Sequence, residues 1–386
     1  MNEFDVIIIG AGSVGCPAAY FLAKEGMRVL VLDELASSGQ GQNKAAIGGV
    51  RATHSDPAKI LLCKQSLDVF GSWKEQTGSD IGFKKGGYCF PVYREQEEKV
   101  LKGILPVQKR FNLNIDWCDA DEIRKVVPGI NPEGLIGGTF SPDDAQVNPL
   151  LASESFTSEA KSLGAVFHYR ESVRGFIMEG NRITAVNTDQ GTYRAEHVVN
   201  AAGAHATQVC EMAGLRIPVN PDSHEGGISA PVKPFLGPLV VDLRPGPEGK
   251  TSNFYFGQNH EGAIIFCYTP CEIFPGENRI STSEFMPIIA RRLVTLIPRF
   301  KHLMIRRIWR GLYPMTPDAL PVVGKPRSVE NLYLAIGMCG QGFMLGPGVG
   351  INIASLICRG KPAIDPEVFA TLSPDREFTG KKEALK

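Results

Sequence analysis

The sequence lacks any pair of cysteines at the spacing of a metal or iron–sulfur motif. Its nine cysteines are scattered along the chain, and only Cys267 and Cys271 are close in sequence. Structural zinc and cluster sites need closely spaced pairs such as C-x-x-C, so no metal site is predicted. The cysteines are expected to be reduced and mostly buried, which is typical of a cytoplasmic protein.

The sequence also lacks an excess of either charge and any long hydrophobic run. Lys+Arg and Asp+Glu are 41 each, so the net charge is zero. A nucleic-acid-binding protein usually has a basic excess, so no nucleic-acid partner is expected. No apolar stretch approaches the roughly 20 residues of a membrane span. The apolar run at residues 4–9 is short and follows no basic segment, so no signal peptide is predicted either.

What the chain does have is a glycine motif near its start. An apolar run precedes Gly10, Gly12 and Gly15, and a helix-like segment and a second apolar run ending at Asp33 follow. In such a strand–helix–strand unit, the first glycine permits a tight turn, the second admits a pyrophosphate and the third lets helix and strand pack. The acid would accept hydrogen bonds from a ribose. This order predicts dinucleotide binding, with a purely structural glycine turn as the alternative.

A second glycine-rich turn, residues 337–350, lies near the other end of the chain, again between an apolar run and a helix-like segment. An NAD site needs only the first turn. FAD also has a flavin ring, whose N1–C2=O edge gathers negative charge on reduction, and a helix N-terminus aimed at this edge would stabilise it. The two turns therefore favour FAD over NAD. The alternative role of the second set of glycines is close helix–strand packing.

Five stretches give the sequence a family likeness. They are the opening motif, the glycine-rich loop running into Arg51, the strand at 198–204, the segment 316–324 and the turn at 340–343. In this order they resemble the D-amino acid oxidase / sarcosine oxidase family (glycine oxidase-like, DAO) of FAD-dependent oxidoreductases. The resemblance covers nearly the whole chain and is strongest to the β subunits of sarcosine oxidase and of L-proline dehydrogenase.

The resemblance implies an α/β (α+β) fold with two domains. One is a Rossmann-like FAD-binding domain, which is discontinuous, and the other is a substrate-binding domain built on a mixed β-sheet. The FAD-binding domain is assigned to residues 1–85, 145–222 and 322–386, and the substrate-binding domain to residues 86–144 and 223–321.

The resemblance also implies a reaction. The enzyme would oxidise the C–N bond of an amino acid or N-alkyl amino acid, such as sarcosine, proline or glycine, by hydride transfer to flavin N5, and the imine would hydrolyse. A partner subunit that accepts electrons is compatible with this. Two alternatives remain: a flavin-dependent 2-hydroxy acid or glycerol-3-phosphate dehydrogenase, and a non-catalytic flavoprotein subunit of an electron-transfer complex. Whether the enzyme is an oxidase or a dehydrogenase is open.

For the substrate site the resemblance selects Arg51, Tyr255, Tyr313 and Met344. Arg51 matches the family arginine that pairs with the substrate carboxylate, with an ion pair inside its own chain as the alternative. Met344 stands where monomeric sarcosine oxidase has a carboxylate-binding lysine. Tyr313 stands where D-amino acid oxidase has an arginine. Tyr255 lies near the family's substrate-site tyrosine, and core packing is its alternative role.

The flavin is predicted to be non-covalent, because Gly311 occupies the position of the cysteine that carries the flavin in monomeric sarcosine oxidase. Cys339 lies beside the flavin loop but not at that position. Lys250 is the nearest candidate for an oxygen-activating lysine. His54 could reach the site or could be a loop histidine without a role, and a structural role is expected for His224.

The residues assigned to FAD binding are Gly10, Gly12, Ser13, Val14, Gly15, Asp33, Glu34, Ser38, Gly39, Ala45, Ala46, Ile47, Val173, Ala201, Ala202, Gly203, Gly311, Gly340, Gln341, Gly342, Phe343 and Met344.

Overall fold

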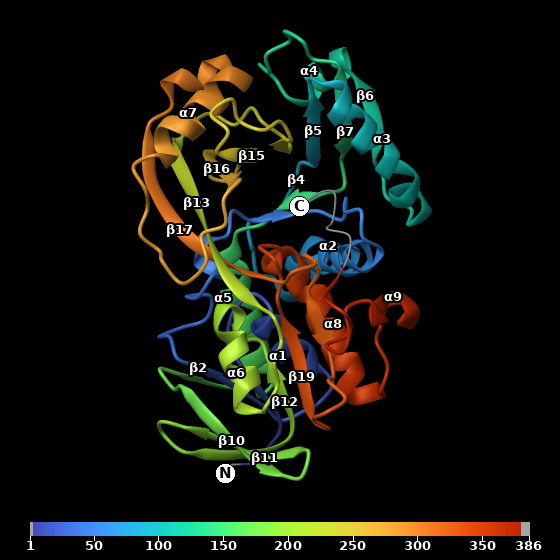
Figure 1. Cartoon of the computed structure of the whole chain (residues 1–386), viewed down its shortest axis with the longest axis vertical. Coiled ribbons are helices and arrows are strands. Elements are labelled where there is room, and N and C mark those ends of the chain that lie inside the picture. Colours follow the sequence, from blue (N-terminus) through green and yellow to red (C-terminus); the bar gives the residue numbers. More distant parts are fainter. Residues whose placement is uncertain (1–2, 380–386) are drawn as a thin grey trace.

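The computed structural model describes residues 3–379 and contains two large β-sheets, one in each half of the molecule (Figure 1). The first sheet has eight strands in the order β10-β11-β12-β1-β2-β9, with β19 paired to β12 and β18 to β19. The strands β1, β2, β9, β12 and β19 pair in parallel, as the βαβ prediction requires. Their bounds are β1 Glu3–Ile9, β2 Val29–Asp33, β9 Val166–Tyr169, β10 Val173–Glu179, β11 Arg182–Thr188, β12 Thr192–Asn200, β18 Val322–Gly324 and β19 Leu332–Ile336.

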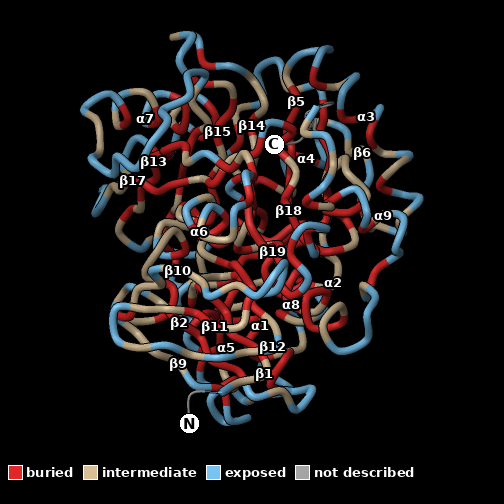
Figure 2. Tube along the Cα trace, turned by 60° about the horizontal axis from the view of Figure 1, so that its bottom comes forward, coloured by how far each residue is buried: buried red, intermediate tan, exposed pale blue. Residues whose placement is uncertain are grey.

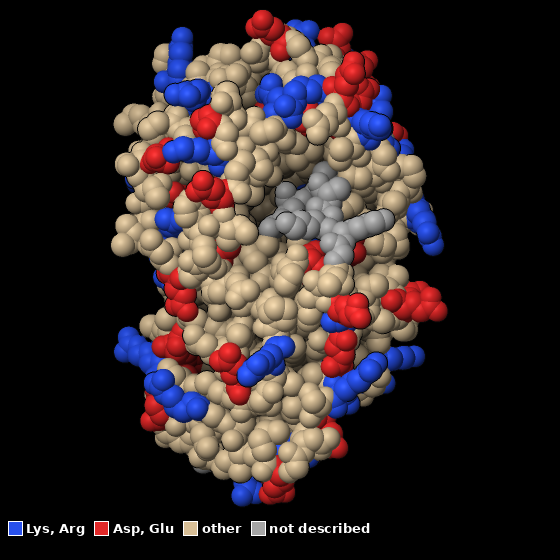
Figure 3. All heavy atoms as spheres, in the orientation of Figure 1, with Lys and Arg blue, Asp and Glu red and all other residues tan. Residues whose placement is uncertain are grey.

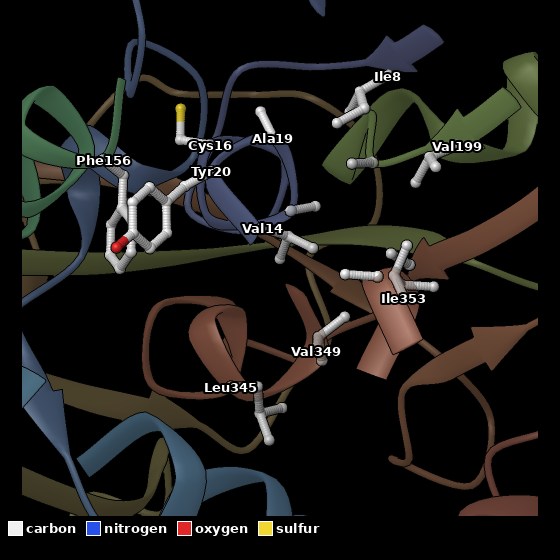
Figure 4. Packing of buried hydrophobic residues seen from close by; sticks show 14 of the residues in the cluster. Ile8, Val14, Cys16, Ala19, Tyr20, Phe156, Val199, Leu345, Val349 and Ile353 are labelled. Carbon is white, nitrogen blue, oxygen red and sulfur yellow. The ribbon is translucent and has the colours of Figure 1, made fainter. Parts of the chain in front are cut away.

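Both faces of this sheet are covered, because parallel strands bury two apolar faces. Val6 and Ile8 of β1 face a core that includes α1, α2, α5 and α8, whereas Ile7 and Ile9 face a second core with α6 and the β10–β11 hairpin. Ile8 and Val199 from the sheet lie in the same cluster as Val349 of α8 (Figure 4). The helices are α1 Gly15–Lys24, α2 Pro57–Thr77, α5 Pro149–Ser162, α6 Ala206–Met212, α8 Gly342–Arg359 and α9 Pro366–Ala370.

The second sheet is mixed and has the order β17-β13-β16-β15-β14-β5-β7-β6. On one face its aromatic residues pack against α4 and α7, and its other face is turned toward the first sheet. Helix α3 packs against β5. The bounds are β5 Tyr88–Val92, β6 Asp116–Asp119, β7 Gly137–Ser141, β13 Asn220–Pro231, β14 Leu239–Asp242, β15 Thr251–Gln258, β16 Ala263–Pro270, β17 Ile305–Met315, α3 Glu95–Arg110, α4 Ala120–Val126 and α7 Phe285–Leu296.

A small three-stranded sheet, β3-β8-β4, lies between the two large ones. Its strand β3 runs directly into Arg51, and β8 directly follows Asp144. Three short 3₁₀ helices complete the fold. The remaining bounds are β3 Gly49–Val50, β4 Lys84–Lys85, β8 Ala145–Gln146, η1 Asn43–Ala45, η2 Gly203–His205 and η3 Pro298–His302.

Several helix ends follow the sequence signals for capping. The Asp56 side chain accepts a hydrogen bond from the Lys59 amide at the start of α2, and Gly78 ends this helix in the left-handed conformation. Asp119 and Glu122 form a capping box at α4. Both helices therefore begin at the residue that follows an aspartate cap.

By length and composition α8 could cross a membrane, but 61% of it is buried inside the structure, as in the core helix of a globular protein. Buried residues run through the interior of both halves of the molecule (Figure 2). On the face shown in Figure 3, acidic and basic side chains are interspersed.

All strands of the first sheet lie in residues 1–85, 145–222 and 322–386, and those of the second lie in residues 86–144 and 220–321. Strand β13 crosses the predicted boundary at 222, so it belongs to both assigned segments. The division of the chain into two domains at these boundaries stays a prediction. Residues 1–2 and 380–386 of the assigned segments lie outside the described residues.

Candidate functional site

A long cavity separates the glycine turns of the first sheet from the facing side of the second. Its lining includes Gly10, Gly12, Ser13 and Val14 from the first turn and residues 337–344 from the second. The two glycine turns, which are far apart in sequence, therefore meet at one site.

The first turn is packed so tightly that two glycines cannot be replaced. Gly10 has a φ of +107°, and a Cβ there would lie 2.5 Å from the Ala201 oxygen. A Cβ on Gly15 would lie 1.8 Å from the Gly10 oxygen. In contrast, no described atom lies within 4 Å of a Cβ built on Gly12. Gly12 thus leaves open space at the N-terminus of α1, where a phosphate would bind.

The second turn brings the N-terminus of α8 to the same place. A Cβ on Gly346 would lie 1.9 Å from the Ser13 oxygen, so α8 packs directly on the first turn. Gln341 is the N-cap residue of α8 and lines the cavity. Two helix N-termini, each with a partial positive charge, therefore face one cavity.

Asp33 ends β2 at the cavity, as predicted. Its carboxylate accepts hydrogen bonds from the backbone N–H of Ala11 at 2.6 Å and of Leu35 at 2.8 Å. Burial raises the pKa of Asp33. An ionised carboxylate has about four acceptor sites, so these bonds leave capacity for a ribose hydroxyl. The neighbouring Glu34 is half-exposed, lines the cavity and lies 3.0 Å from His205 Nδ1.

Two buried amide oxygens in the cavity wall test whether FAD fits. Asn43 Oδ1 and Gln341 Oε1 find no hydrogen-bond partner among residues 3–379. Both side chains are more than nine-tenths buried and line the cavity. A buried acceptor without a donor costs about 1–3 kcal/mol, so these oxygens suit a ligand that brings N–H or O–H groups. FAD has such groups on its ring and ribityl chain, and it fits this lining.

Most of the residues assigned to FAD line the cavity, but three do not. Gly15 fills its predicted packing role. Ser38 is hydrogen-bonded to Tyr169 and Thr157, both at 2.8 Å. Gly39 donates its N–H to the Ala11 oxygen at 2.8 Å. Ser38 and Gly39 therefore hold the loop in place rather than face the cavity. The assigned residues that line it are Gly10, Gly12, Ser13, Val14, Asp33, Glu34, Ala45, Ala46, Ile47, Val173, Ala201, Ala202, Gly203, Gly311, Gly340, Gln341, Gly342, Phe343 and Met344.

The opposite wall is one face of the second sheet, which the sequence reasoning largely missed. Side chains point to alternate faces of a strand, so every second residue reaches the cavity. The sequence signal for these residues is their alternation along each strand, counted from Tyr255 and Tyr313. The wall residues are Tyr88, Phe90, His224, Gly226, Leu239, Val241, Asn253, Tyr255, Cys267, Thr269, Trp309, Gly311 and Tyr313.

Arg51 is buried in the cavity lining directly after β3. Its Nη1 donates to the Thr53 oxygen, and its Cζ lies 5.7 Å from the Phe90 ring centroid. The buried carboxylate of Asp144 accepts from the Ala52 amide at 2.8 Å and from Thr53 Oγ1 at 2.9 Å. Burial raises the pKa of Asp144 to about 6, and the positive charge of Arg51 partly opposes this rise. An acid of the same chain, the alternative partner considered for Arg51, therefore lies beside it.

Tyr255 and Tyr313 face the cavity together. Their hydroxyl oxygens are 2.9 Å apart. The Tyr313 ring stacks on His224 with a centroid separation of 4.0 Å, and His224 Nε2 lies 3.1 Å from Asp222 Oδ2. Burial raises the pKa of both phenols, and it raises the pKa of the adjacent Cys267 thiol to about 12. These three groups are therefore neutral at physiological pH.

Other candidates from the sequence lie elsewhere. Lys250, the nearest candidate for an oxygen-activating lysine, is exposed, pairs with Glu284 at 2.7 Å and does not line the cavity. His54 is fully buried, lies 3.5 Å from Cys63 Sγ and does not line the cavity. It is a buried histidine of the segment between β3 and α2, and so it does not reach the site. The part of the chain that the structure describes has no group of three or more potential metal ligands.

Gly311 and Cys339 both line the cavity. A Cβ on Gly311 would lie 2.5 Å from the Ala45 Cβ, so a cysteine does not fit there without a shift. Cys339 Sγ lies 3.2 Å from Thr316 Oγ1 and 3.1 Å from the Gly337 oxygen. That the flavin is bound non-covalently stays a prediction.

A dinucleotide-binding site that faces a mixed β-sheet across a cavity is typical of flavin-dependent oxidoreductases. Comparison with family models matches residues 5–356 to the FAD dependent oxidoreductase (DAO) family. The chain belongs to this family, and FAD is its cofactor.

One solved structure shares the fold over the whole chain, and curated relatives match most of the sequence. L-proline dehydrogenase from P. horikoshii superimposes with a TM-score of 0.91 at 30% identity, over 99% of both chains. The sarcosine oxidase β subunit of Arthrobacter sp is 24% identical over 93% of this chain and 88% of its own. Human mitochondrial dimethylglycine dehydrogenase is 25% identical over 97% of this chain but only 44% of its own length. The chain thus spans about half the length of the dimethylglycine dehydrogenases it matches.

Proposed function

We propose that this protein oxidises the C–N bond of an amino acid or N-alkyl amino acid. The observation that carries the proposal is the buried guanidinium of Arg51 in the wall of the FAD cavity. A guanidinium presents a planar fork of N–H donors that matches a carboxylate. The names of similar proteins support the same chemistry, since they include a proline dehydrogenase, a sarcosine oxidase subunit and a dimethylglycine dehydrogenase.

When bound, FAD would provide the acceptor for a hydride equivalent from the carbon next to the nitrogen. The chain's own residues do the positioning. Arg51 would hold the substrate carboxylate at the end of the cavity near Phe90. Tyr255 and Tyr313 stay protonated because burial raises their pKa, so they serve as hydrogen-bond donors and acceptors and not as bases. The substrate amine would accordingly enter in its neutral form, and the imine product would hydrolyse in water.

We further propose that a partner protein, rather than dioxygen, takes up the electrons. Within residues 3–379, no lysine lines the cavity, and an oxygen-activating lysine is what the family resemblance implies for an oxidase. The matched sarcosine oxidase protein is, by its name, a subunit of a larger enzyme.

We also propose a cytoplasmic location. All nine cysteines are free thiols, which supports this proposal.

The test is anaerobic reduction of the FAD-loaded protein by candidate amines, with Arg51→Gln as the variant. We expect amino acids to bleach the flavin absorption. Without this carboxylate partner, the amino acid concentration that gives half-maximal flavin reduction should rise by about 100-fold, while FAD stays bound. Arg327→Gln is the matched control, because Arg327 is 90% exposed and distant from the lining. Bleaching by 2-hydroxy acids but not by amino acids, or an unchanged concentration dependence in Arg51→Gln, would contradict the proposal.

A further inference from the structure

The cavity wall nearest Arg51 is apolar. Tyr88 and Phe90 of β5 and Leu239 of β14 belong to one buried cluster, and Val241 and Leu243 pack against it. All five also line the cavity. They reach it because Leu239 and Val241 alternate with Val240 and Asp242, which face the other side of the sheet.

This apolar wall adjoins the guanidinium. A Cβ on Gly49, two residues before Arg51, would lie 1.8 Å from Tyr88 Oη and 2.9 Å from Leu239 Cδ1. The Phe90 ring lies 5.7 Å from Arg51 Cζ. A carboxylate bound to Arg51 would therefore place the rest of an amino acid against the side chains of β5 and β14.

Charged side chains of β14 and of helix α7 lie on the side of the sheet away from the cavity. Asp242 is buried and pairs with Arg244 at 2.6 Å. Arg292 donates to Thr251 Oγ1 at 2.6 Å and its guanidinium lies over Phe254, on the side of the sheet that packs against α7. Among the described residues, no charged side chain of β5 or β14 lines the cavity, and the other charged residues of the lining, Glu225 among them, come from other segments. A charged substrate side chain would lose its hydration there without gaining a partner.

We propose that the substrate is an amino acid with an apolar, branched or cyclic side chain, and that Val241 and Leu243 set this selectivity. The inference rests on the proposed function, since it takes Arg51 as the carboxylate site. It predicts that acidic and basic amino acids are poor substrates even though the carboxylate they share is bound by the same arginine.

Binding of non-oxidisable carboxylates tests the inference without turnover. We would titrate the FAD-loaded protein with 4-methylpentanoate and with glutarate and follow the perturbation of the flavin absorption. The two ligands are similar in length, but glutarate has a second carboxylate in place of the branched end. We expect 4-methylpentanoate to bind at least about tenfold more tightly, since a few buried methyl groups and an avoided unpaired charge both favour it.

Substitutions test whether Val241 and Leu243 determine the preference between the two carboxylates. Val241→Thr keeps the shape and adds a hydroxyl, and Leu243→Arg, at a half-buried position, adds a charge partner. We expect Val241→Thr to reduce the preference for 4-methylpentanoate and Leu243→Arg to reverse it. Val240→Ala is the control, because Val240 is fully buried on the other face of β14. It should lower stability and leave the ratio of the two dissociation constants unchanged.

Reduction by leucine, glutamate and lysine in the same protein separates the two proposals. If leucine reduces the flavin fastest, both stand. If glutamate or lysine reduces it as fast as leucine, or glutarate binds as tightly as 4-methylpentanoate, the side-chain inference is wrong while the proposed C–N oxidation stands. If no amino acid reduces the flavin and neither carboxylate binds, the proposed function fails and this inference fails with it.

Discussion

The hydroxyl oxygens of Tyr255 and Tyr313 are 2.9 Å apart, although their strands β15 and β17 are separated in the sheet by β16 and β13. The two phenols thus span two intervening strands over the cavity-facing side. Cys267 of β16 lies within hydrogen-bonding reach of both. The pair links the edge strand β17 to the inner strand β15 across the cavity-facing side of the sheet.

Removing either hydroxyl should destabilise the protein, because the other hydroxyl then stays buried without its partner. We expect Tyr255→Phe and Tyr313→Phe each to lower the free energy of unfolding by about 1–3 kcal/mol. The double variant should lose less than the sum of the two, with a coupling energy of about 1 kcal/mol. Urea unfolding of the FAD-loaded proteins measures all three values.

Tyr20→Phe serves as the control for this cycle. The Tyr20 ring is buried in an aromatic cluster, and its hydroxyl makes no hydrogen bond within the described part of the chain. Its removal should change the free energy of unfolding by less than about 0.5 kcal/mol. Additive effects of Tyr255→Phe and Tyr313→Phe would mean that the two hydroxyls do not interact in solution.

Asp144 should make the stability depend on pH. Its pKa is raised from 3.8 to about 6 in the folded protein, mainly by burial. Between these values the folded state binds more protons than the unfolded state, so stability falls as pH rises. The favourable contribution is complete below about pH 4 and is lost as the pH passes about 6.

Asp144→Asn isolates this effect, since the amide cannot ionise. The free energy of unfolding of the wild type, minus that of Asp144→Asn, should decrease between pH 4 and pH 7 by roughly 3 kcal/mol. Urea unfolding at several pH values, with FAD in excess, gives this difference. A difference that stays constant across the window would show that Asp144 is ionised in the folded protein as readily as in the unfolded chain.

The sequence predicted the first sheet well because its signals are local. The apolar run of β1, the glycine turn, α1 and Asp33 follow one another within 33 residues, and each has its own pattern. The second sheet is different. Strand β14 pairs in parallel with β5, about 150 residues earlier in the chain, and no local pattern specifies such a partner.

The same distinction explains the site. Glycines with special geometry, such as Gly10 and Gly346, can be recognised from their motifs. Asn43 and Trp309 could not, because they reach the cavity only through the loop and sheet that carry them. Lys250 illustrates the same limit. Sequence position alone could not show that it pairs with Glu284 on the surface.

Gly346→Ala should separate α8 from the first turn. The added Cβ would meet the Ser13 oxygen at 1.9 Å, and neither the helix nor the turn can absorb this without moving. We expect a loss of about 1–3 kcal/mol in the free energy of unfolding and weaker FAD binding, because the two helix N-termini that face the cavity shift. Fluorescence titration of the FAD-depleted protein measures the second effect.

Gly103→Ala in α3 is the matched helix substitution. No described atom lies within 4 Å of a Cβ at this position. Alanine should therefore stabilise the helix by up to about 1 kcal/mol and leave FAD affinity unchanged. If Gly346→Ala behaved like Gly103→Ala, the close contact between α8 and the first turn would be wrong.

The contact between Gly311 and Ala45 can be tested by moving the methyl group from position 45 to position 311. Gly311→Ala should weaken FAD binding and lower the free energy of unfolding by about 1–3 kcal/mol, because its Cβ would lie 2.5 Å from that of Ala45. Adding Ala45→Gly removes the opposing methyl, and the hydrogen bond from Trp309 Nε1 to the Ala45 oxygen, at 2.9 Å, involves only the backbone and is kept. The double variant should therefore recover most of the FAD affinity that Gly311→Ala loses, although Ala45→Gly alone gives no gain. Equal losses in Gly311→Ala and in the double variant would show that another contact, and not the Ala45 methyl, excludes a side chain at position 311.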